Sequence, residues 1–248
     1  MTDQIQTTRQ GQVQTIRFNR PEKKNAITND MYHGLVDALE AGEADESVHV
    51  HVLFGHPGVF TAGNDVMDFV KLAQGSGLAE SGVARYLRLQ PDIQKPFLAA
   101  VDGLAVGIGT TLLFHCDMVF ATPGSEFMTP FVDLGLVAEN ASSLLAPRIM
   151  GAQRAFEMLA LAERFSAERA AEAGLVNAVL PPERLEPHTM EIAARLAAKP
   201  QQALRLTKQL LKGDSAPVHE VSRREADLFA ARLKSTEAQQ AFLAFMSR

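Results

Sequence analysis

The sequence predicts an α/β fold whose C-terminal part is mostly helical. Short alternating or β-branched segments, such as residues 48–55, have the pattern of strands up to about residue 142. Segments with apolar residues at helical spacing lie between them, which is the order of an α/β core. After residue 142 helical patterns dominate. The hydrophobic content of 46% in 248 residues is sufficient for a sizeable core.

The first part of the chain alternates strands and helices. Residues 13–18 alternate as a strand does, and residues 48–55 predict a second, β-branched strand. Between them, residues 28–44 predict a helix whose one face carries apolar side chains, namely Met31, Leu35, Ala38 and Leu39. Residues 56–65 predict a loop, and Asp65 is placed to cap the helix that follows.

Further along, residues 95–103 predict a buried strand, residues 106–116 a glycine-led helix and residues 117–122 another strand. The remaining chain predicts one short strand and five helices, over residues 174–181 and over residues 143–162, 166–173, 183–198, 200–212 and 216–246. Amphipathic helices at a chain end often bury their apolar face on a neighbouring subunit. We therefore expect residues 1–190 to form the core and residues 191–248 to form a helical oligomerisation region.

Composition and charge limit the classes of function. The net charge of −5 argues against a general nucleic-acid or membrane-surface role, because both require a basic face. The single Cys116 excludes an internal disulfide and fits a reducing compartment. The polar start "MTDQIQTTRQ" lacks the apolar run of a secretory signal, and no apolar stretch is long enough to span a membrane. We expect a cytoplasmic protein.

Two loop-to-helix junctions are candidates for a binding site. The segments "FTAGND" (60–65) and "DGLAVGIGTTLL" (102–113) are rich in small residues that let a ligand approach the backbone. The N–H groups that open the following helices have no partner within those helices. Two such donors that converge on one point would form an oxyanion hole. The alternative interpretation is a pair of tight turns that pack strands closely against helices.

Glu139 interrupts the apolar, small-residue stretch "LGLVAENASSL" (134–144), and no cation or second acid lies within several positions of it. Partial burial would raise the pKa of its carboxyl group toward the range useful for proton transfer. Alternatively, Glu139 lies in the first turn of the following helix and interacts favourably with the helix dipole.

Several motifs together resemble the crotonase, or enoyl-CoA hydratase/isomerase, superfamily over nearly the whole chain. The segment "NRPEKKNAI" is similar to an early motif of this family, and "FTAGND" to its first oxyanion-hole motif. The segment "KPFLAAVDGLAVGIGTTLLFHCDMVFAT" resembles the second, and "AERAAEAGLVNAVLP" resembles a later Gly-Leu-Val segment. The motifs occur in the order and spacing of the family.

The resemblance implies a spiral of ββα units followed by C-terminal helices, assembled as a trimer or a dimer of trimers. It implies an acyl-CoA thioester as substrate, in fatty-acid oxidation. Coenzyme A is then part of the substrate, so no separate cofactor and no metal are expected. His49, His51 and His56 are accordingly interpreted as ordinary residues rather than metal ligands.

Carried over to this sequence, the resemblance implies that the backbone N–H groups of Asn64 and Ile108 hold the thioester oxygen. It also implies substrate contacts by further residues, namely Ala62, Gly63, Asn64, Asp65, Val66, Lys24, Gly107, Phe131 and Leu136. Lys23 and Lys24 would meet the phosphates of coenzyme A, or else simply form a solvated turn.

The acids distinguish the reactions of the superfamily. Hydratases carry two glutamates that activate a water, and the corresponding positions here hold Thr111 and Phe131, neither of which is an acid. The segment "LGLVAENASS" is similar to the segment in which monofunctional 3,2-enoyl-CoA isomerases of the peroxisomal type carry a single catalytic glutamate. This resemblance assigns Glu139 as the catalytic acid and base of an isomerase.

Alternatives remain at the sequence level. Asp133 would share a face with Phe131 in an extended segment, although an aspartate that precedes a turn is the better interpretation. Asn140 would orient Glu139 or, more simply, cap the helix that begins near Ser142. At the level of the whole protein, the alternatives to an isomerase are a hydratase with relocated acids and a non-catalytic acyl-CoA binder.

Overall fold

The computed structural model describes residues 3–65, 67–68 and 80–246. In this part of the chain, six strands form one sheet in the order β1-β2-β3-β5-β7-β10. All neighbours are parallel except β1 and β2, which form an antiparallel hairpin. The strands are β1 (Ile5–Gln10), β2 (Val13–Phe18), β3 (Val50–Phe54), β5 (Phe97–Val101), β7 (Met118–Ala121) and β10 (Ala178–Val179).

A second, smaller sheet has the order β4-β6-β8-β9 in the described residues. Its strands are β4 (Val59–Thr61), β6 (Leu104–Val106), β8 (Glu126–Met128) and β9 (Phe165–Ser166). The chain passes from β3 to β4, from β5 to β6 and from β7 to β8, so consecutive strands alternate between the two sheets. This alternation produces a spiral of strand–strand–helix turns, which confirms the predicted α/β fold class.

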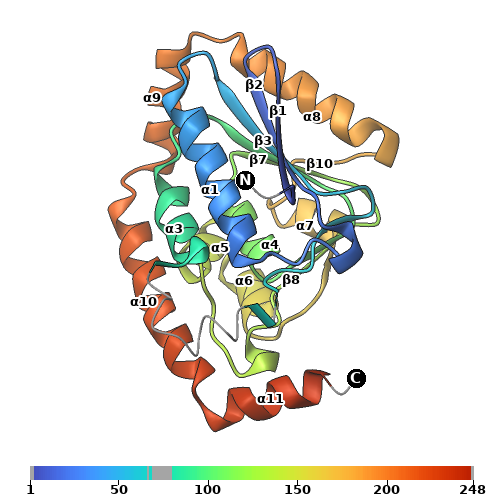
Figure 1. Ribbon diagram of the computed structural model, residues 1–248, viewed down its shortest axis with the longest axis vertical. Coiled ribbons are helices and arrows are strands. Elements are labelled where there is room, and N and C mark those ends of the chain that lie inside the picture. The colour runs from blue at the N-terminus through green and yellow to red at the C-terminus, as the bar shows by residue number, and fades with distance from the viewer. Residues whose placement is uncertain (1–2, 66, 69–79, 247–248) are drawn as a thin grey trace.

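Helices cover both faces of the large sheet (Figure 1). They are α1 (Asn29–Ala44), α3 (Gly82–Leu89), α4 (Ile108–Thr111), α5 (Ser142–Met150), α6 (Ala152–Leu159), α7 (Ala167–Glu172), α8 (Pro182–Ala197), α9 (Gln201–Lys212), α10 (Ala216–Leu233) and α11 (Thr236–Met246). Short 3₁₀ turns are η1 (Pro21–Lys23), η3 (Gln90–Asp92), η4 (Leu112–His115) and η5 (Val132–Leu134).

Strand β3 shows why the sheet is buried on both sides. Val50, Val52 and Phe54 pack in one core cluster with side chains of α8, such as Leu185. Leu53, on the opposite face of the strand, belongs to the other cluster, beneath α1, α3 and α4. The strand was predicted from its alternating, β-branched sequence, although both of its faces are covered and even His51 is buried.

Some elements differ from the prediction. The helix predicted over residues 143–162 is two helices, α5 and α6, because Gly151 lies between them with φ 80°. The helix predicted over residues 216–246 is likewise divided into α10 and α11. Residues 56–65, predicted as a loop, contain the three-residue strand β4. In contrast, the helix predicted over residues 183–198 is present as α8, which runs from Pro182 to Ala197 and packs on the large sheet.

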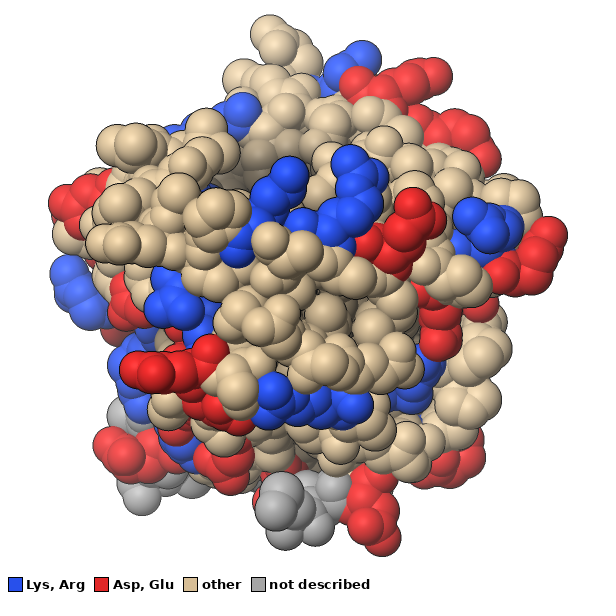
Figure 2. Space-filling model, turned by 90° about the horizontal axis from the view of Figure 1, so that it is seen from above, with Lys and Arg blue, Asp and Glu red and all other residues tan. Residues whose placement is uncertain are grey.

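The C-terminal helices surround the core. Figure 1 shows α10 along one side of the molecule and α11 crossing below it, next to the chain end. Side chains of these two helices, Phe229 and Ala238, form a third cluster with Phe131 and Leu136. No helix in the described residues is both long enough and apolar enough to cross a membrane. On the face seen in Figure 2, acidic and basic side chains are interspersed rather than gathered into one basic surface.

Candidate active site

The two glycine-bearing junctions lie side by side. Strands β4 and β6, which lead into them, are parallel neighbours, with Thr61 paired with Ala105. A Cβ atom on Gly63 would lie 2.6 Å from the carbonyl oxygen of Val106, a distance that real Cβ atoms do not reach. The approach of the two turns therefore requires glycine at position 63, where φ is also positive at 87°.

Both predicted oxyanion donors lie at these turns. Ile108 opens α4 directly after Gly107, which has φ 56°. Asn64 follows Gly63, whose backbone packs against Val106. Within the described chain, neither the N–H of Asn64 nor that of Ile108 donates to a hydrogen-bond acceptor. Two free amides on adjacent turns are what an oxyanion hole requires.

A third loop braces the first junction. The N–H of Ala62 donates to the carbonyl of Lys24 at 2.9 Å, and Ile27 and residues 63–65 exchange two more backbone hydrogen bonds. Arg20 Nη1 lies 2.7 Å from Asp65 Oδ2, and together with a bond from the Asp68 N–H it lowers the pKa of Asp65 despite partial burial. The bond from Asp68 is the one expected of Asp65 as an N-cap.

The other predicted contact residues lie nearby or outside the described chain. Phe131 is buried, and its ring lies 3.7 Å from the position that a Cβ on Gly107 would occupy. The N–H of Leu136 donates to the carbonyl of Phe131 at 2.7 Å, which places both in one turn. Lys23 and Lys24 are exposed. Val66 lies outside the described residues.

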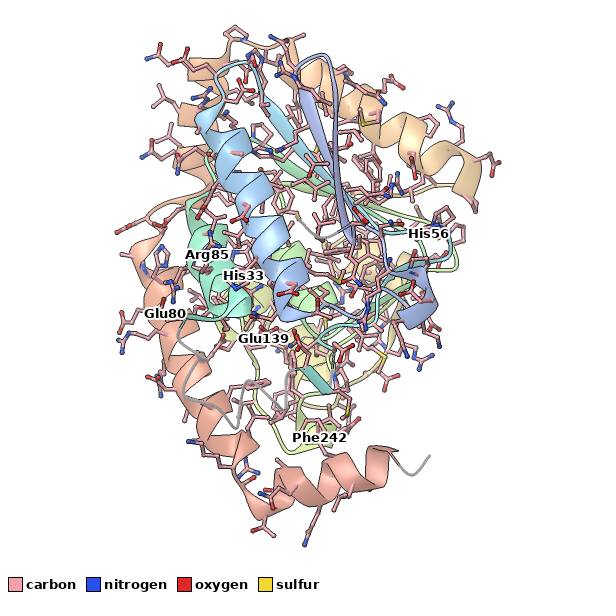
Figure 3. All side chains as sticks on the ribbon, viewed as in Figure 1. His33, His56, Glu80, Arg85, Glu139 and Phe242 are labelled. Atoms are coloured by element: carbon pink, nitrogen blue, oxygen red, sulfur yellow. The ribbon has the colours of Figure 1, made fainter. Side chains whose placement is uncertain are left out.

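Glu139 is in the interior of the molecule, with a side chain only 8% exposed (Figure 3). The hydroxyl of Thr111 donates to its Oε1 at 2.5 Å. Because Thr111 is on α4, which opens at Ile108, this bond places the carboxylate against the second junction. By the resemblance described above, Thr111 stands at a sequence position where hydratases have an acid. Here the side chain at this position is a hydroxyl, and it orients Glu139 through the hydrogen bond.

Burial raises the pKa of Glu139 to about 8. Desolvation, the largest cause, disfavours the charged form. The hydrogen bond from Thr111 acts in the opposite direction, and the nearby Glu225 raises the pKa further. A carboxyl group with a pKa near neutrality both accepts and returns a proton efficiently, as general acid–base catalysis requires.

Both tyrosines of the chain lie close to Glu139, and the sequence analysis identified neither. Tyr32 on α1 donates its hydroxyl hydrogen to Asn64 Oδ1 at 2.6 Å and so holds the side chain of Asn64 at the first junction. Its ring centroid lies 5.8 Å from that of Tyr86 on α3. The pKa of each phenol is raised well above its usual value, mainly by burial, and the charge of Glu139 contributes. The signal in the sequence is weak, because tyrosine on a helical face is usually part of the core.

The turn that follows Glu139 has an unusual backbone. Asn140 and Ala141 both have left-handed conformations, with φ values of 60° and 54°. Such a conformation costs a residue other than glycine roughly 1–2 kcal/mol. The side chain of Asn140 donates to Gln90 Oε1 at 3.0 Å, and His115 Nε2 lies 2.9 Å from its carbonyl oxygen.

Two alternative interpretations from the sequence are wrong. Asn140 does not cap α5, since Ala141 occupies the cap position and makes no side-chain bond there. Glu139 does not lie in the first turn of α5, which begins at Ser142. Asp133, in contrast, is exposed in η5 and precedes the left-handed Gly135, as the simpler interpretation predicted.

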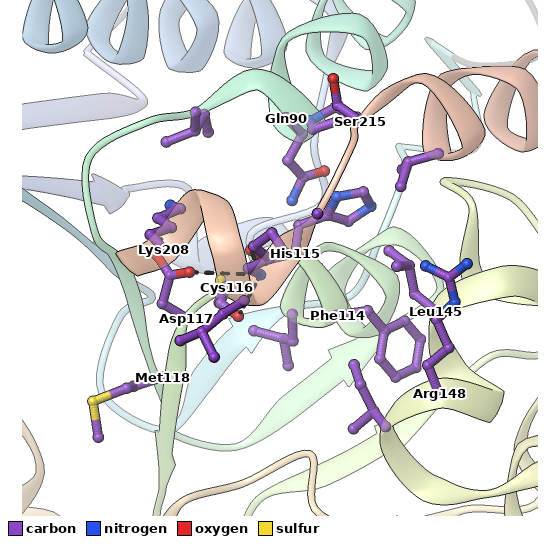
Figure 4. Close-up of a pocket in the computed structure, with 18 of the residues that line it drawn as sticks. Gln90, Phe114, His115, Cys116, Asp117, Met118, Leu145, Arg148, Lys208 and Ser215 are labelled. Carbon is purple, nitrogen blue, oxygen red and sulfur yellow. Dashed lines mark hydrogen bonds and ion pairs between the residues drawn. The ribbon is translucent and has the colours of Figure 1, made fainter. Parts of the chain in front are cut away.

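A separate cavity of about 490 Å³ lies beside η4 and is lined by residues of η3, η4, α5 and α9 (Figure 4). Its lining includes His115, Asp117, Arg148 and Lys208, but not Glu139, Asn64 or Ile108. Lys208 Nζ and Asp117 Oδ2 form an ion pair at 2.7 Å across part of it. This cavity is therefore distinct from the pair of junctions.

The described residues contain no group of three or more His, Cys, Asp or Glu side chains placed to hold a metal ion. His51 lies between Gln14 and Glu43, to which its two ring nitrogens are bonded at 2.7 and 2.9 Å. His49 is bonded to the carbonyl of Ala197 at 2.9 Å.

Comparisons with known proteins agree with these features. The family model described as enoyl-CoA hydratase/isomerase matches residues 8–248. Human "Enoyl-CoA delta isomerase 2" is 35% identical over 94% of this chain, which spans 60% of that relative's length. "2,3-Dehydroadipyl-CoA hydratase" of Escherichia coli (strain K12) is 29% identical, with 97% of this chain and 94% of the relative covered.

A solved structure of Pseudomonas aeruginosa OdaA superposes on the whole chain with a TM-score of 0.94 and 40% identity, and all of that chain is covered. Its backbone therefore follows the same spiral of strand–strand–helix turns. Together with the family model, the similarity to the isomerase and the geometry of the two junctions, this establishes that the chain belongs to the enoyl-CoA hydratase/isomerase, or crotonase, family.

Proposed function

We propose that the protein moves the double bond of a 3-enoyl-CoA to give the trans-2-enoyl-CoA. The observation that carries this proposal is the buried carboxyl group of Glu139, which is bonded to Thr111 beside the two junctions. The positions of both hydratase acids hold residues that do not ionise as acids, Thr111 and Phe131. One carboxylate is sufficient for an isomerisation, whereas activation of a water for addition normally employs two.

The proton transfers follow from this arrangement. The Glu139 carboxylate removes a proton from C2, and the electron pair of that C–H bond delocalises over C4, C3, C2 and the thioester carbonyl. The N–H groups of Asn64 and Ile108 donate to the resulting oxyanion, and loss of one such donor typically costs about 10²–10³ in rate. Protonated Glu139 then gives a proton to C4, which leaves the double bond between C2 and C3. Both transfers occur on one face of a planar dienolate.

A test with two substrates separates this proposal from hydration. Purified protein is incubated with trans-3-enoyl-CoA and, separately, with trans-2-enoyl-CoA, and the products are resolved by chromatography and mass. The proposal predicts rapid conversion of the first substrate to the second, with little 3-hydroxyacyl-CoA from either. Efficient hydration of trans-2-enoyl-CoA would instead favour the second candidate, a hydratase with relocated acids, the reaction class named for the E. coli relative.

We further propose that the chain acts as a homo-oligomer, a trimer or a dimer of trimers, in the cytoplasm. Helix α9 supports the assembly because it exposes three leucines, Leu206, Leu210 and Leu211, the last two by more than 80%. Apolar side chains so exposed on one helix are typical of a surface that a second subunit covers.

A further inference from the structure

One buried acid beside the candidate site has no role in the mechanism above. Glu225 lies on α10 and is only 5% exposed. The inward-facing residues of this helix are Val218, Ser222, Glu225 and Phe229, so the carboxyl group occupies a stripe that is otherwise apolar or small. A charged side chain in such a position is rarely retained unless it has a specific partner.

The partner of Glu225 is the turn that carries Glu139. Glu225 Oε1 accepts a hydrogen bond from the backbone N–H of Ser143 at 2.9 Å. The preceding residue, Ser142, bonds the carbonyl oxygen of Glu139 twice, through its N–H at 3.1 Å and its hydroxyl at 2.6 Å. Through the adjacent residues Ser143 and Ser142, hydrogen bonds thus connect α10 with the backbone of Glu139.

The hydrogen bond from Ser143 to Glu225 holds a turn whose backbone conformation is unfavourable. Asn140 and Ala141 lie between Glu139 and Ser142 in left-handed conformations that residues with a Cβ atom disfavour. Such conformations persist only where surrounding contacts determine them, and Glu225 supplies one of these contacts from a helix more than 80 residues away in sequence.

The same helix reaches the site at a second point. The ring of Phe229 packs edge-on against Phe131, with centroids 6.2 Å apart, and Phe131 lies against Gly107 at the second junction. Besides the N–H of Ser143, the side chain of Ser143 and the backbone of Ala141 act on the Glu225 carboxyl group and lower its pKa, against the larger effect of burial.

We propose that Glu225 is a positioning residue for Glu139, which holds the turn of residues 139–143 in its catalytic conformation and makes α10 part of the active site. This inference rests on the proposed isomerase function. The negative charge of Glu225 also raises the pKa of Glu139, and burial raises the pKa of Glu225 itself. The other titratable groups around the two carboxyls are Tyr32 on α1, Tyr86 on α3 and His115 on η4.

Two variants separate the roles of hydrogen bond and charge. Glu225→Gln keeps an oxygen that can accept from Ser143 but removes the charge, so the pKa of Glu139 should fall. The rise of kcat/KM with pH should then move to lower pH, with kcat on the plateau retained. Glu225→Ala removes the acceptor as well, and displacement of the Glu139 turn should lower kcat by about 10- to 100-fold with KM little changed.

Glu220→Gln is the matched control, because Glu220 is exposed on the same helix and undergoes the same chemical change. Titration of the Glu139 carboxyl by ¹³C NMR, assigned with Glu139→Gln, gives a second readout that needs no turnover. Thermal unfolding of each variant verifies folding. If Glu225→Ala does not fold, the titration midpoint in Glu225→Gln still decides the question.

The expected result is a Glu139 midpoint at lower pH in Glu225→Gln than in the wild type and in Glu220→Gln. Equal midpoints in all three proteins would overturn the inference, as would full kcat in a folded Glu225→Ala variant. Failure of the proposed function has a different signature, since the wild type would then lack isomerase activity while the NMR titration still reported on Glu225.

Discussion

At the scale of single residues, the ionisation of Glu139 depends on opposing contacts. Burial and the charge of Glu225 raise its pKa, whereas the hydroxyl of Thr111 lowers it, with a result of about 8. The carboxylate is the form that removes a proton from C2. Activity should therefore rise with pH through this pKa, and the neighbouring residues should set the position of the rise.

Removal of the Thr111 hydroxyl should move this rise to higher pH. Thr111→Val has nearly the same shape but loses the hydrogen bond that lowers the pKa of Glu139. Thr111→Ser keeps a hydroxyl and should restore the wild-type midpoint. The measurement is kcat/KM against pH for the three proteins. A Val variant with the wild-type profile would show that the bond has no influence on the proton transfer.

Glu139 should also make stability depend on pH. Its pKa in the folded protein is about 8, above the ordinary value of 4.5, so the folded state binds the extra proton between these values. Stability is thus lost as pH rises from about 4.5 to 8, by at most on the order of 5 kcal/mol. The Glu139→Gln variant has no ionisable group at this position, so its stability lacks this dependence on pH.

The free energy of unfolding of Glu139→Gln, obtained from denaturant titrations, should exceed that of the wild type at pH 9. The two proteins should converge toward pH 5. A difference that does not vary with pH would contradict burial of the carboxylate, because a solvated Glu139 would have the same pKa in both states.

At the scale of elements, sequence patterns predicted the large sheet better than the small one. β3 and β5 are buried on both faces, and β3 was predicted from its β-branched residues and β5 from its apolar run. In contrast, β1 buries only Ile5 at the sheet edge and has no hydrophobic pattern. Strands β4, β6 and β8 have three residues each, too few for a period to appear. Their positions depend on contacts between distant segments.

The sequence likewise predicted only those parts of the candidate site that are local in the chain. The glycines at positions 63 and 107 and the isolated Glu139 are visible as local motifs in the sequence. Tyr32, Glu225 and the bond between Thr111 and Glu139 depend on residues that folding brings together from 28 or more positions apart. No local pattern encodes such contacts, so the sequence alone did not reveal them.

The close contact of the two junctions can be tested with a pair of glycine variants. Gly58 and Gly63 have similar positive φ values, 80° and 87°, so alanine is strained at both. A Cβ on Gly58 meets no atom within 4 Å, whereas one on Gly63 lies 2.6 Å from the Val106 carbonyl oxygen. Gly63→Ala should therefore separate the two turns.

We expect Gly63→Ala to reduce kcat by at least about 10²-fold, the typical effect of losing one oxyanion donor. Gly58→Ala should cost only the backbone strain, roughly 1–2 kcal/mol of stability, and should keep its activity. Steady-state kinetics and thermal unfolding of both variants provide the comparison. Equal kinetic losses in the two variants would contradict the contact between the junctions.

At the scale of the whole molecule, the spiral brings three loops and one C-terminal helix to a single acid. The strands that end at the two junctions belong to the small sheet, and Glu225 of α10 accepts a hydrogen bond from the turn that follows Glu139. In our proposal, a second subunit covers the exposed leucines of α9.

The proposed assembly predicts the effect of one added charge on molecular mass. Leu210→Glu places a carboxylate where the leucine side chain is 85% exposed, so the fold of the subunit should not change. Desolvation of that charge should weaken the association of subunits and increase the monomer fraction. Light scattering after size-exclusion chromatography measures the molecular mass. The control is Leu161→Glu, because Leu161 is also exposed. A wild-type protein that is monomeric would refute the assembly.

In the proposed reaction, the buried carboxylate of Glu139 carries the proton between two carbons of an acyl-CoA. The most direct test is the rate at which Glu139→Gln converts trans-3-enoyl-CoA, together with its affinity for a saturated acyl-CoA. We expect a loss of at least about 10³-fold in kcat with the affinity largely kept. An active wild type and a variant that retains its full rate would contradict it.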